Sequence, residues 1–237
     1  MQHNCRVAIM QPYFLPYLGY WQIMNYVDTF VVYDDIQFTK KGWIHRNRYL
    51  NNGKDRFFTL PLKKDSDYLD VRDREISTNW PRDKQKLYNK IKGAYATAPF
   101  FNEGMTVFNR CIQCESQNLF TFLLHSIHVI KSVLDITSNI VTSSNIGSTK
   151  HLKGQSRVIE ICRKVGADEY LNPIGGKELY NREAFEADGI ALIFHEVGEV
   201  SYKQLNSAYV RNLSIIDTIM FNGINGTKAL LPAFRLL

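Results

Sequence analysis

Two short apolar runs near the start of the chain, residues 6–10 and 29–33, constrain the fold more than any other feature. Within each run the side chains are apolar at consecutive positions, so neither face of the strand suits water. This pattern is typical of strands in a parallel sheet that is covered on both sides. Parallel strands need a crossover, and residues 18–26 are predicted to form the connecting helix. The chain is therefore predicted to begin with a right-handed strand–helix–strand unit.

The remaining patterns predict more strands and helices, with two insertions. Asn52-Gly53 lies between two extended runs and is a strong hairpin signal. Later strands are predicted at residues 140–142, 169–171 and 191–194, with helices at 155–165, around 181–187 and at 214–221, the last ending near Gly223. This order predicts a single α/β domain over residues 1–237, with a central mostly parallel sheet and flanking helices. Residues 44–62 would be an inserted basic hairpin, and residues 80–135 a helical insertion or lid.

Composition limits the class of protein. A hydrophobic share of 45% and a charged share of 22% are ordinary for a globular protein and argue against disorder. The most apolar long segment, residues 112–131, is interrupted by polar side chains, so no membrane span is expected. The first residues contain no apolar signal core, and the four cysteines have no framework spacing. We therefore expect a reducing, cytoplasmic location.

The positive charge is concentrated in one window. Residues 40–64 hold eight Lys and Arg residues against one acid, Asp55, a net charge of +7. The formal net charge of the whole chain is +6, so the rest of the chain is close to neutral. A local basic patch favours an anionic partner such as a phosphate, a carboxylate, a nucleotide or a nucleic acid. The alternative is a solvated basic hairpin that binds no specific ligand.

The segment of residues 10–48 has the densest set of chemical groups. Parallel sheets bind ligands where strands end in loops, and Asp34 and Asp35 follow the second predicted strand. Two carboxylates there can hold Mg²⁺, orient an amine or act as a base, with Gln11 and Gln37 as neutral hydrogen-bonding partners. Because side chains alternate along a strand, the two carboxylates are expected to point to opposite faces, so that at most one reaches the site. The predicted substrate-binding residues are Tyr13, Tyr17, Gly19, Tyr20, Lys41, Trp43, His45, Arg46, Asn47, Arg48, Ser143, Ser144 and Tyr202.

Each of these signals has a structural alternative. Adjacent aspartates are common in turns, and the tyrosines are equally typical of core packing. Cys111 and Cys114 have the spacing of a redox or zinc pair, but no second pair accompanies them, and no metal site is assigned. His125 and His128 lie in an apolar helical pattern, where buried histidines are expected.

Several stretches resemble the WbqC-like protein family. They are QPYFLPYLGY (residues 11–20), YDDIQF (33–38), KGWIHRNR (41–48), Pro61, Ser143-Ser144, ICRKVGADEY (161–170), YKQ (202–204), LSIID (213–217) and Gly223. Members of this family are bacterial, and many are encoded with O-antigen or other surface-polysaccharide functions. The resemblance implies a biological setting and does not specify a reaction.

A shorter element is similar to one in nucleotidylyltransferases and pantoate ligases. Tyr17-Leu-Gly-Tyr20 follows a strand and a proline-rich loop, as does the His-x-Gly-His element whose histidines contact phosphates in those enzymes. Here both positions are tyrosine, which donates a hydrogen bond but has no positive charge at neutral pH.

The favoured function is an enzyme that transfers an acyl or aminoacyl group to the amine of a nucleotide-linked amino sugar, with ATP as a candidate cofactor. One of the two aspartates would orient or deprotonate the amine, and Gln11 and Ser143 would position the acyl group. The hairpin cations would hold the diphosphate, while Tyr17, Tyr20 and Trp43 would stack on a ring. The alternatives are a nucleotidylyltransferase-like enzyme and a non-catalytic binding protein. In the latter, an anion or nucleic acid would bind to Trp43, Tyr49, Phe57 and Phe58, with nucleic acid the less favoured partner.

Overall fold

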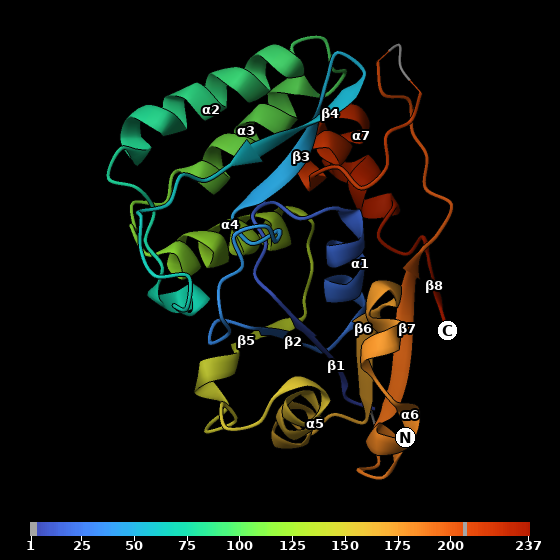
Figure 1. Cartoon of the computed structure of the whole chain (residues 1–237). Coiled ribbons are helices and arrows are strands. Elements are labelled where there is room, and N and C mark those ends of the chain that lie inside the picture. The colour runs from blue at the N-terminus through green and yellow to red at the C-terminus, as the bar shows by residue number, and fades with distance from the viewer. Residues whose placement is uncertain (1–3, 206–207) are drawn as a thin grey trace.

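A six-stranded sheet forms the centre of the protein in the computed structural model, which describes residues 4–205 and 208–237 (Figure 1). The strand order is β5-β2-β1-β6-β7-β8. The strands are β1 (Arg6–Met10), β2 (Thr29–Val32), β5 (Asn139–Thr142), β6 (Glu169–Pro173), β7 (Ala191–Val197) and β8 (Phe234–Leu236). All adjacent pairs are parallel except β7–β8, which is antiparallel. The predicted α/β class with a mostly parallel sheet is confirmed.

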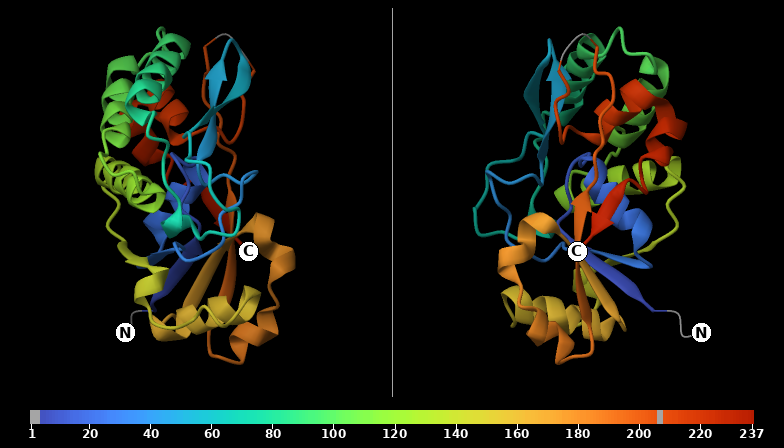
Figure 2. Two further views of the ribbon diagram at one scale, coloured as in Figure 1. Left: turned by 60° about the vertical axis from the view of Figure 1, so that its left-hand side comes forward. Right: turned by 90° about the vertical axis from the view of Figure 1, so that its right-hand side faces the viewer.

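Helices cover both faces of this sheet, as the apolar runs predict. Val7, Ile9 and Val31 face one buried cluster, which includes residues of α5 (Gly154–Lys164) and α6 (Arg182–Glu186). Ala8 and Met10 face the other cluster, which includes residues of α1 (Leu18–Tyr26), α4 (Leu119–Val133) and α7 (Ile215–Ala229). Figure 2 shows these two groups of helices on opposite sides of the sheet. Consecutive apolar residues in β1 therefore fill two cores.

The order of the strands identifies a ligand-binding edge. The chain leaves β1 through α1 to reach β2, and it leaves β5 through α5 to reach β6 on the other side of β1. The helix that follows β1 is α1 and the helix that follows β6 is α6, and they lie on opposite faces of the sheet. The loops after β1 and β6 therefore diverge at the carboxyl ends of these strands. A crevice at such a switch point is the usual ligand site of open α/β sheets.

The hairpin and the helical segments form a lobe beyond this edge (Figures 1 and 2). The hairpin consists of β3 (Arg46–Asn51) and β4 (Lys54–Thr59), with positive φ angles at Asn52 and Gly53, as a tight primed turn requires. It packs against α2 (Trp80–Ala94) and α7, and the lobe also contains α3 (Phe101–Ile112) and α4. Short 3-10 helices complete the fold: η1 (Val71–Asp73), η2 (Ser143–Asn145) and η3 (Ile174–Leu179).

The last helix, α7, consists of two helical segments. The backbone leaves helical geometry at Gly223, where the sequence predicts the helix to end, and a second segment continues to Ala229. Gly223 has a φ of 67°, and its carbonyl accepts a hydrogen bond from Thr227 Oγ1 at 2.7 Å. A Cβ at this position would come within 2.7 Å of the Phe100 ring. The glycine thus ends the first helical segment of α7 at a kink beside Phe100.

Candidate functional site

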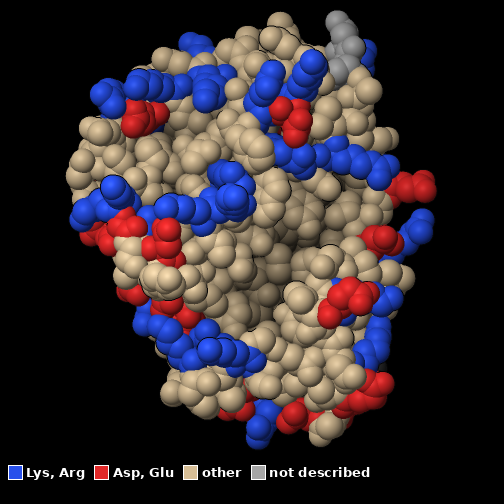
Figure 3. All heavy atoms as spheres, viewed as in Figure 1, with Lys and Arg blue, Asp and Glu red and all other residues tan. Residues whose placement is uncertain are grey.

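A hollow opens between the lobe and the carboxyl edge of the sheet, and Lys and Arg side chains gather along its rim (Figure 3). Two adjoining cavities of about 250 Å³ each lie at this edge and share Tyr17 and Asn212. The aromatic cavity is lined by Tyr13, Tyr17, Trp43, Asn47, Arg48 and Asn212. The edge cavity lies between the start of α1, the end of β7 and residues 198–202 and 209–213.

The aromatic cavity brings together two segments that sequence reasoning singled out. Tyr13 and Tyr17 come from the loop after β1, and Trp43 and Arg48 come from the start of the hairpin. The Tyr13 and Tyr17 hydroxyls make no hydrogen bond with any described residue, and burial raises the pKa of Tyr13 to about 12. These phenols are therefore neutral groups that offer both a donor and an acceptor to a ligand.

Asn47 and Arg48 shape this cavity through bonds within the protein. Asn47 Nδ2 donates to the carbonyls of Phe14 and Leu15 at 3.2 and 2.9 Å, which ties the hairpin to the loop after β1. Arg48 Nη1 lies 3.0 Å from Asp55 Oδ2, and Arg48 Nη2 donates to the Asn212 carbonyl at 3.2 Å. Its guanidinium carbon is 5.6 Å from the centre of the Trp43 ring. Arg48 thus supplies positive charge at the cavity while it holds residues 211–212 in place.

The edge cavity contains an acid, Glu196, that was not among the predicted site residues. Glu196, at the end of β7, lines it together with Tyr202, Tyr209 and Arg211. The Glu196 carboxylate forms no ion pair or hydrogen bond within the part of the chain that the structure describes. The sequence offered only a strand end followed by Glu196, a weak signal. In this position the carboxylate is available to a ligand in the cavity.

The start of α1 is less open than predicted. Tyr17 and Ser214 form an isolated antiparallel β-bridge, and the Ile215 N–H donates to the Pro16 carbonyl at 2.9 Å. The segment before α7 therefore covers the start of α1. Tyr20 is fully buried, and its hydroxyl donates to the Gln11 carbonyl at 3.3 Å. Of the two tyrosines in the element compared with His-x-Gly-His, the structure brings only Tyr17 to a cavity.

Gly19 lies in the first turn of α1 at a close approach to two cavity-lining side chains. A Cβ there would come within 2.5 Å of Tyr17 Cε2 and 2.7 Å of Val197 Cγ2. We expect Gly19→Ala to lower the free energy of unfolding by about 1–2 kcal/mol, because overpacking exceeds the gain in helix propensity. Denaturant unfolding measures this. Gly93→Ala in α2, where a Cβ meets open space, is the control and is expected to be neutral or stabilising. Equal stabilisation of both variants would contradict the close approach.

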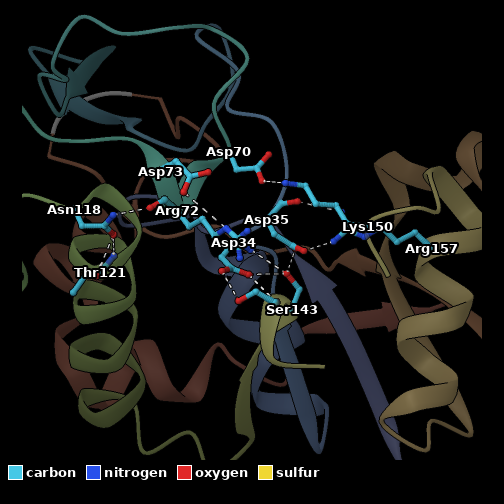
Figure 4. Close-up of polar contacts among 11 residues, drawn as sticks. Asp34, Asp35, Asp70, Arg72, Asp73, Asn118, Thr121, Ser143, Lys150 and Arg157 are labelled. Atoms are coloured by element: carbon cyan, nitrogen blue, oxygen red, sulfur yellow. Dashed lines mark hydrogen bonds and ion pairs between the residues drawn. The ribbon is translucent and has the colours of Figure 1, made fainter. Parts of the chain in front are cut away.

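Asp34 and Asp35 line neither of these two cavities. They form a network with Ser143 and Arg157 (Figure 4), and Ser144 also belongs to it. Ser143 Oγ contacts Asp34 Oδ1 at 2.8 Å and Asp35 Oδ1 at 2.5 Å. Asp34 also accepts from the N–H and hydroxyl of Ser144, at 3.0 and 2.8 Å. The expectation of opposite directions is wrong, because β2 ends at Val32 and strand alternation stops before these residues. Both carboxylates are buried and converge on one serine hydroxyl.

Arg157, from α5, completes this network. Its Nη2 lies 2.6 Å from Asp35 Oδ2, and its Nη1 donates to the Asp35 carbonyl at 3.2 Å. Nearby, Lys150 pairs with Asp70, and both Lys150 and Arg157 line a third cavity of about 490 Å³. We call it the lateral cavity; Asp35 and Gln37 also line it. Gln37 donates from Nε2 to the Asp67 carbonyl at 3.0 Å.

The remaining predicted residues are on the hairpin. Lys41 is exposed, and Arg46 Nε donates to the Gly42 carbonyl at 3.0 Å. The ring of His45 packs 5.1 Å from that of Phe38, and burial lowers the pKa of His45 to about 4, so this histidine is neutral. Trp43 and Phe57 stack 5.9 Å apart, with Arg46 over Phe57 and Arg48 over Trp43. Tyr49 and Phe58, predicted for a nucleic-acid platform, are buried in the core.

A buried polar cluster around Asp217 was not predicted as part of the site. Asp217 has no exposed surface, and it accepts hydrogen bonds from Tyr95, Tyr202 and Gln204 at 2.8 Å each. Burial is the main cause that raises its pKa to about 6, and the three donors oppose this shift. Tyr95 also accepts from the Leu50 N–H at 2.9 Å. The cluster links α7, the hairpin and the wall of the edge cavity, where Tyr202 lies.

The described residues contain no group of three or more His, Cys, Asp or Glu side chains arranged to hold a metal ion. Cys111 is buried, and burial raises the pKa of its thiol, so the thiolate is disfavoured. Among the described residues, no helix has both the length and the apolarity needed to cross a membrane.

Comparison with known proteins gives a family match over nearly the whole chain. The model of the WbqC-like protein family matches residues 11–229. The uncharacterized protein Rv1507c of Mycobacterium tuberculosis is 26% identical over 226 residues, covering 92% of this chain and 93% of that protein. No solved structure shows significant similarity to the chain.

Proposed function

Because this chain belongs to the WbqC-like protein family, we propose that it works in the synthesis of a bacterial surface polysaccharide, the setting implied by the family resemblance. The proposed reaction transfers an acyl or aminoacyl group to the amine of a nucleotide-linked amino sugar. The observation that supports it most is the adjoining pair of cavities at the carboxyl edge of the sheet. One cavity has aromatic walls, and the other contains a carboxylate that forms no ion pair with any described residue.

The two cavities suit the two ends of such a substrate. Tyr13, Tyr17 and Trp43 form walls on which a sugar or base ring packs, and the two phenol hydroxyls suit its polar groups. Arg48 and Arg211 supply positive charge for the diphosphate, and the cationic hairpin attracts it from solution. Glu196 in the edge cavity suits the amine. The network of Asp34 and Asp35 holds the loops after β2 and β5 in this proposal.

The reaction is a nucleophilic substitution at a carbonyl carbon. The amine nitrogen attacks this carbon of the acyl donor, the new C–N bond forms, and the bond to the leaving group breaks with its electron pair. The proton that the amine loses passes to the Glu196 carboxylate, which acts as the general base. A free amino acid as donor needs ATP, whose cleavage creates the leaving group.

The direct test incubates the protein with UDP-glucosamine and with ATP plus a pool of amino acids, or with acyl thioesters, and follows the sugar by mass spectrometry. A mass gain equal to one acyl or aminoacyl group, on the amine, is the expected result. Pyrophosphate release from a nucleoside triphosphate and a sugar phosphate, with no acylated product, would instead support nucleotidyl transfer. That alternative has less support because Tyr20 is buried and the start of α1 is covered.

Trp43 offers a binding test with a matched control. We expect Trp43→Ala to weaken UDP-glucosamine binding about tenfold or more, because a ring stacked on an aromatic side chain contributes about 1–3 kcal/mol. Trp43 and Phe57 are similarly exposed, at 39% and 49%, but Phe57 does not line the aromatic cavity. Phe57→Ala is therefore expected to change the affinity less than threefold. Calorimetric titration measures both, and equal losses would contradict the assignment of the cavity.

A further inference from the structure

The lateral cavity is a concavity that the proposed acceptor site does not use. It lies between the segment after β2, the start of α5 and the end of η3, and it has no lining residue in common with the aromatic or edge cavity. Its volume of about 490 Å³ is the largest of the three. A ligand there would contact the carboxyl edge of the sheet at β2 rather than at β7.

The walls of the lateral cavity are largely apolar. Ile36, Leu152 and Val158 line it, and Tyr33 and Tyr180 add aromatic surface. Leu179, at its rim, is 70% exposed and adds apolar surface to the mouth of the cavity. An apolar group in the cavity would cover this side chain and remove it from water.

The polar part of the lateral cavity is cationic. Arg157 is 7% exposed and is paired with Asp35, and Lys150 is paired with Asp70 (Figure 4). Lys153 is exposed, and its ammonium group has no ion pair or hydrogen bond with any described residue. Three cations against two acids leave one positive charge uncompensated at the mouth of an apolar cavity.

We propose that the lateral cavity binds an amphipathic anion, a molecule with an apolar acyl body and a negatively charged head, and that this molecule is the donor in the transfer reaction. The assignment of this molecule as the donor rests on the proposed function, whereas the inference that the cavity binds an amphipathic anion does not. Ile174, at one end of η3, lines the edge cavity, and Leu179, at the other end, lines the lateral cavity. Five residue steps of a 3-10 helix span about 10 Å, so the two ligands would lie within one substrate length of each other.

Octanoate is the probe, because it has an apolar tail and an anionic head. Calorimetry or ligand-observed NMR is expected to give saturable binding, while inorganic phosphate and 1-octanol, which each lack one of the two parts, bind at least about tenfold more weakly. Lys153→Glu and Leu179→Ser are each expected to weaken octanoate binding about fivefold. Both side chains are exposed, so these variants should fold. Lys90→Glu, at an exposed position of α2, is the charge-matched control and is expected to have no effect.

The outcomes separate this inference from the proposed function. Saturable octanoate binding without any UDP-glucosamine binding would remove the proposed function and leave the amphipathic site in place. The absence of saturable octanoate binding, or an equal loss in Lys90→Glu, would overturn the inference while UDP-glucosamine binding stands. Sedimentation with phosphatidylglycerol vesicles that Lys153→Glu abolishes would assign the anion to a lipid and overturn the assignment as donor.

Discussion

Replacing Asp35 by alanine is expected to lower the free energy of unfolding by about 3–5 kcal/mol, the largest effect of any single substitution considered for this protein. Asp35 and Arg157 form an ion pair at 2.6 Å, and both side chains are less than a tenth exposed. Alanine leaves the Arg157 guanidinium buried without its anion and also leaves Ser143 Oγ without one of its two carboxylate partners. Unfolding by urea, followed by circular dichroism, measures the loss.

The partner variant is the control for this prediction. Arg157→Met removes the cation, and the double variant Asp35→Ala with Arg157→Met removes the uncompensated charge, so it should regain a substantial part of the stability lost in Asp35→Ala. Additive losses in the double variant would contradict a coupled pair. If Asp35 were instead a free general base, its substitution would abolish turnover and leave stability unchanged. The measurement therefore also decides between a structural and a catalytic role.

Replacing Asp217 by asparagine is expected to flatten the dependence of stability on pH. The pKa of Asp217 is raised from 3.8 to about 6 in the folded protein, mainly by burial, so the folded state binds this proton more tightly than the unfolded state does. The contribution of Asp217 to the free energy of unfolding is therefore highest below pH 4 and falls as the pH rises through 6. The difference is about 3 kcal/mol, from roughly 1.4 kcal/mol per unit. Asparagine does not titrate, so this decline should be absent in the variant.

Urea unfolding at intervals from pH 4 to 7 tests this prediction. Tyr202→Phe is the informative companion, because the Tyr202 hydroxyl donates to the Asp217 carboxylate and lowers its pKa. Removing that donor should move the decline to higher pH rather than abolish it. Parallel pH profiles for the wild type and Asp217→Asn would show that another group is responsible.

Local sequence patterns predicted part of the candidate site. The convergence of Tyr13 and Tyr17 with Trp43 and Arg48 was predicted, and the structure places all four around one cavity. Each pattern was short-range: proline and glycine in a loop after a strand, and Asn-Gly in a hairpin. The same patterns also suggested Tyr20, which the structure buries, because an aromatic side chain in a helix suits a core as well as a ligand.

The pairings between distant residues had no local signal. Asp217 and Tyr95 are 122 positions apart in the sequence, and Ser143 is 109 positions from Asp34. Glu196 lies near the end of a strand, where glutamates with a purely structural role are also common. Only the neighbouring cavity indicates a binding role for its carboxylate. Long-range pairings of this kind depend on the directions in which loops leave the sheet. The periodicity of hydrophobic residues in a sequence does not specify these directions.

The sequence by itself determined the two-sided apolar strands, the hairpin turn and the concentration of cations after β2, because each depends on residues within a few positions of one another. Only the tertiary structure decided which polar groups meet. The insertion between β2 and β5 and the crossover to β6 bring distant segments to one edge, where burial pairs Asp35 with Arg157 and leaves Glu196 and Lys153 without a partner among the described residues. The physical reason is that burial, which makes a polar contact strong or costly, is a property of the assembled fold.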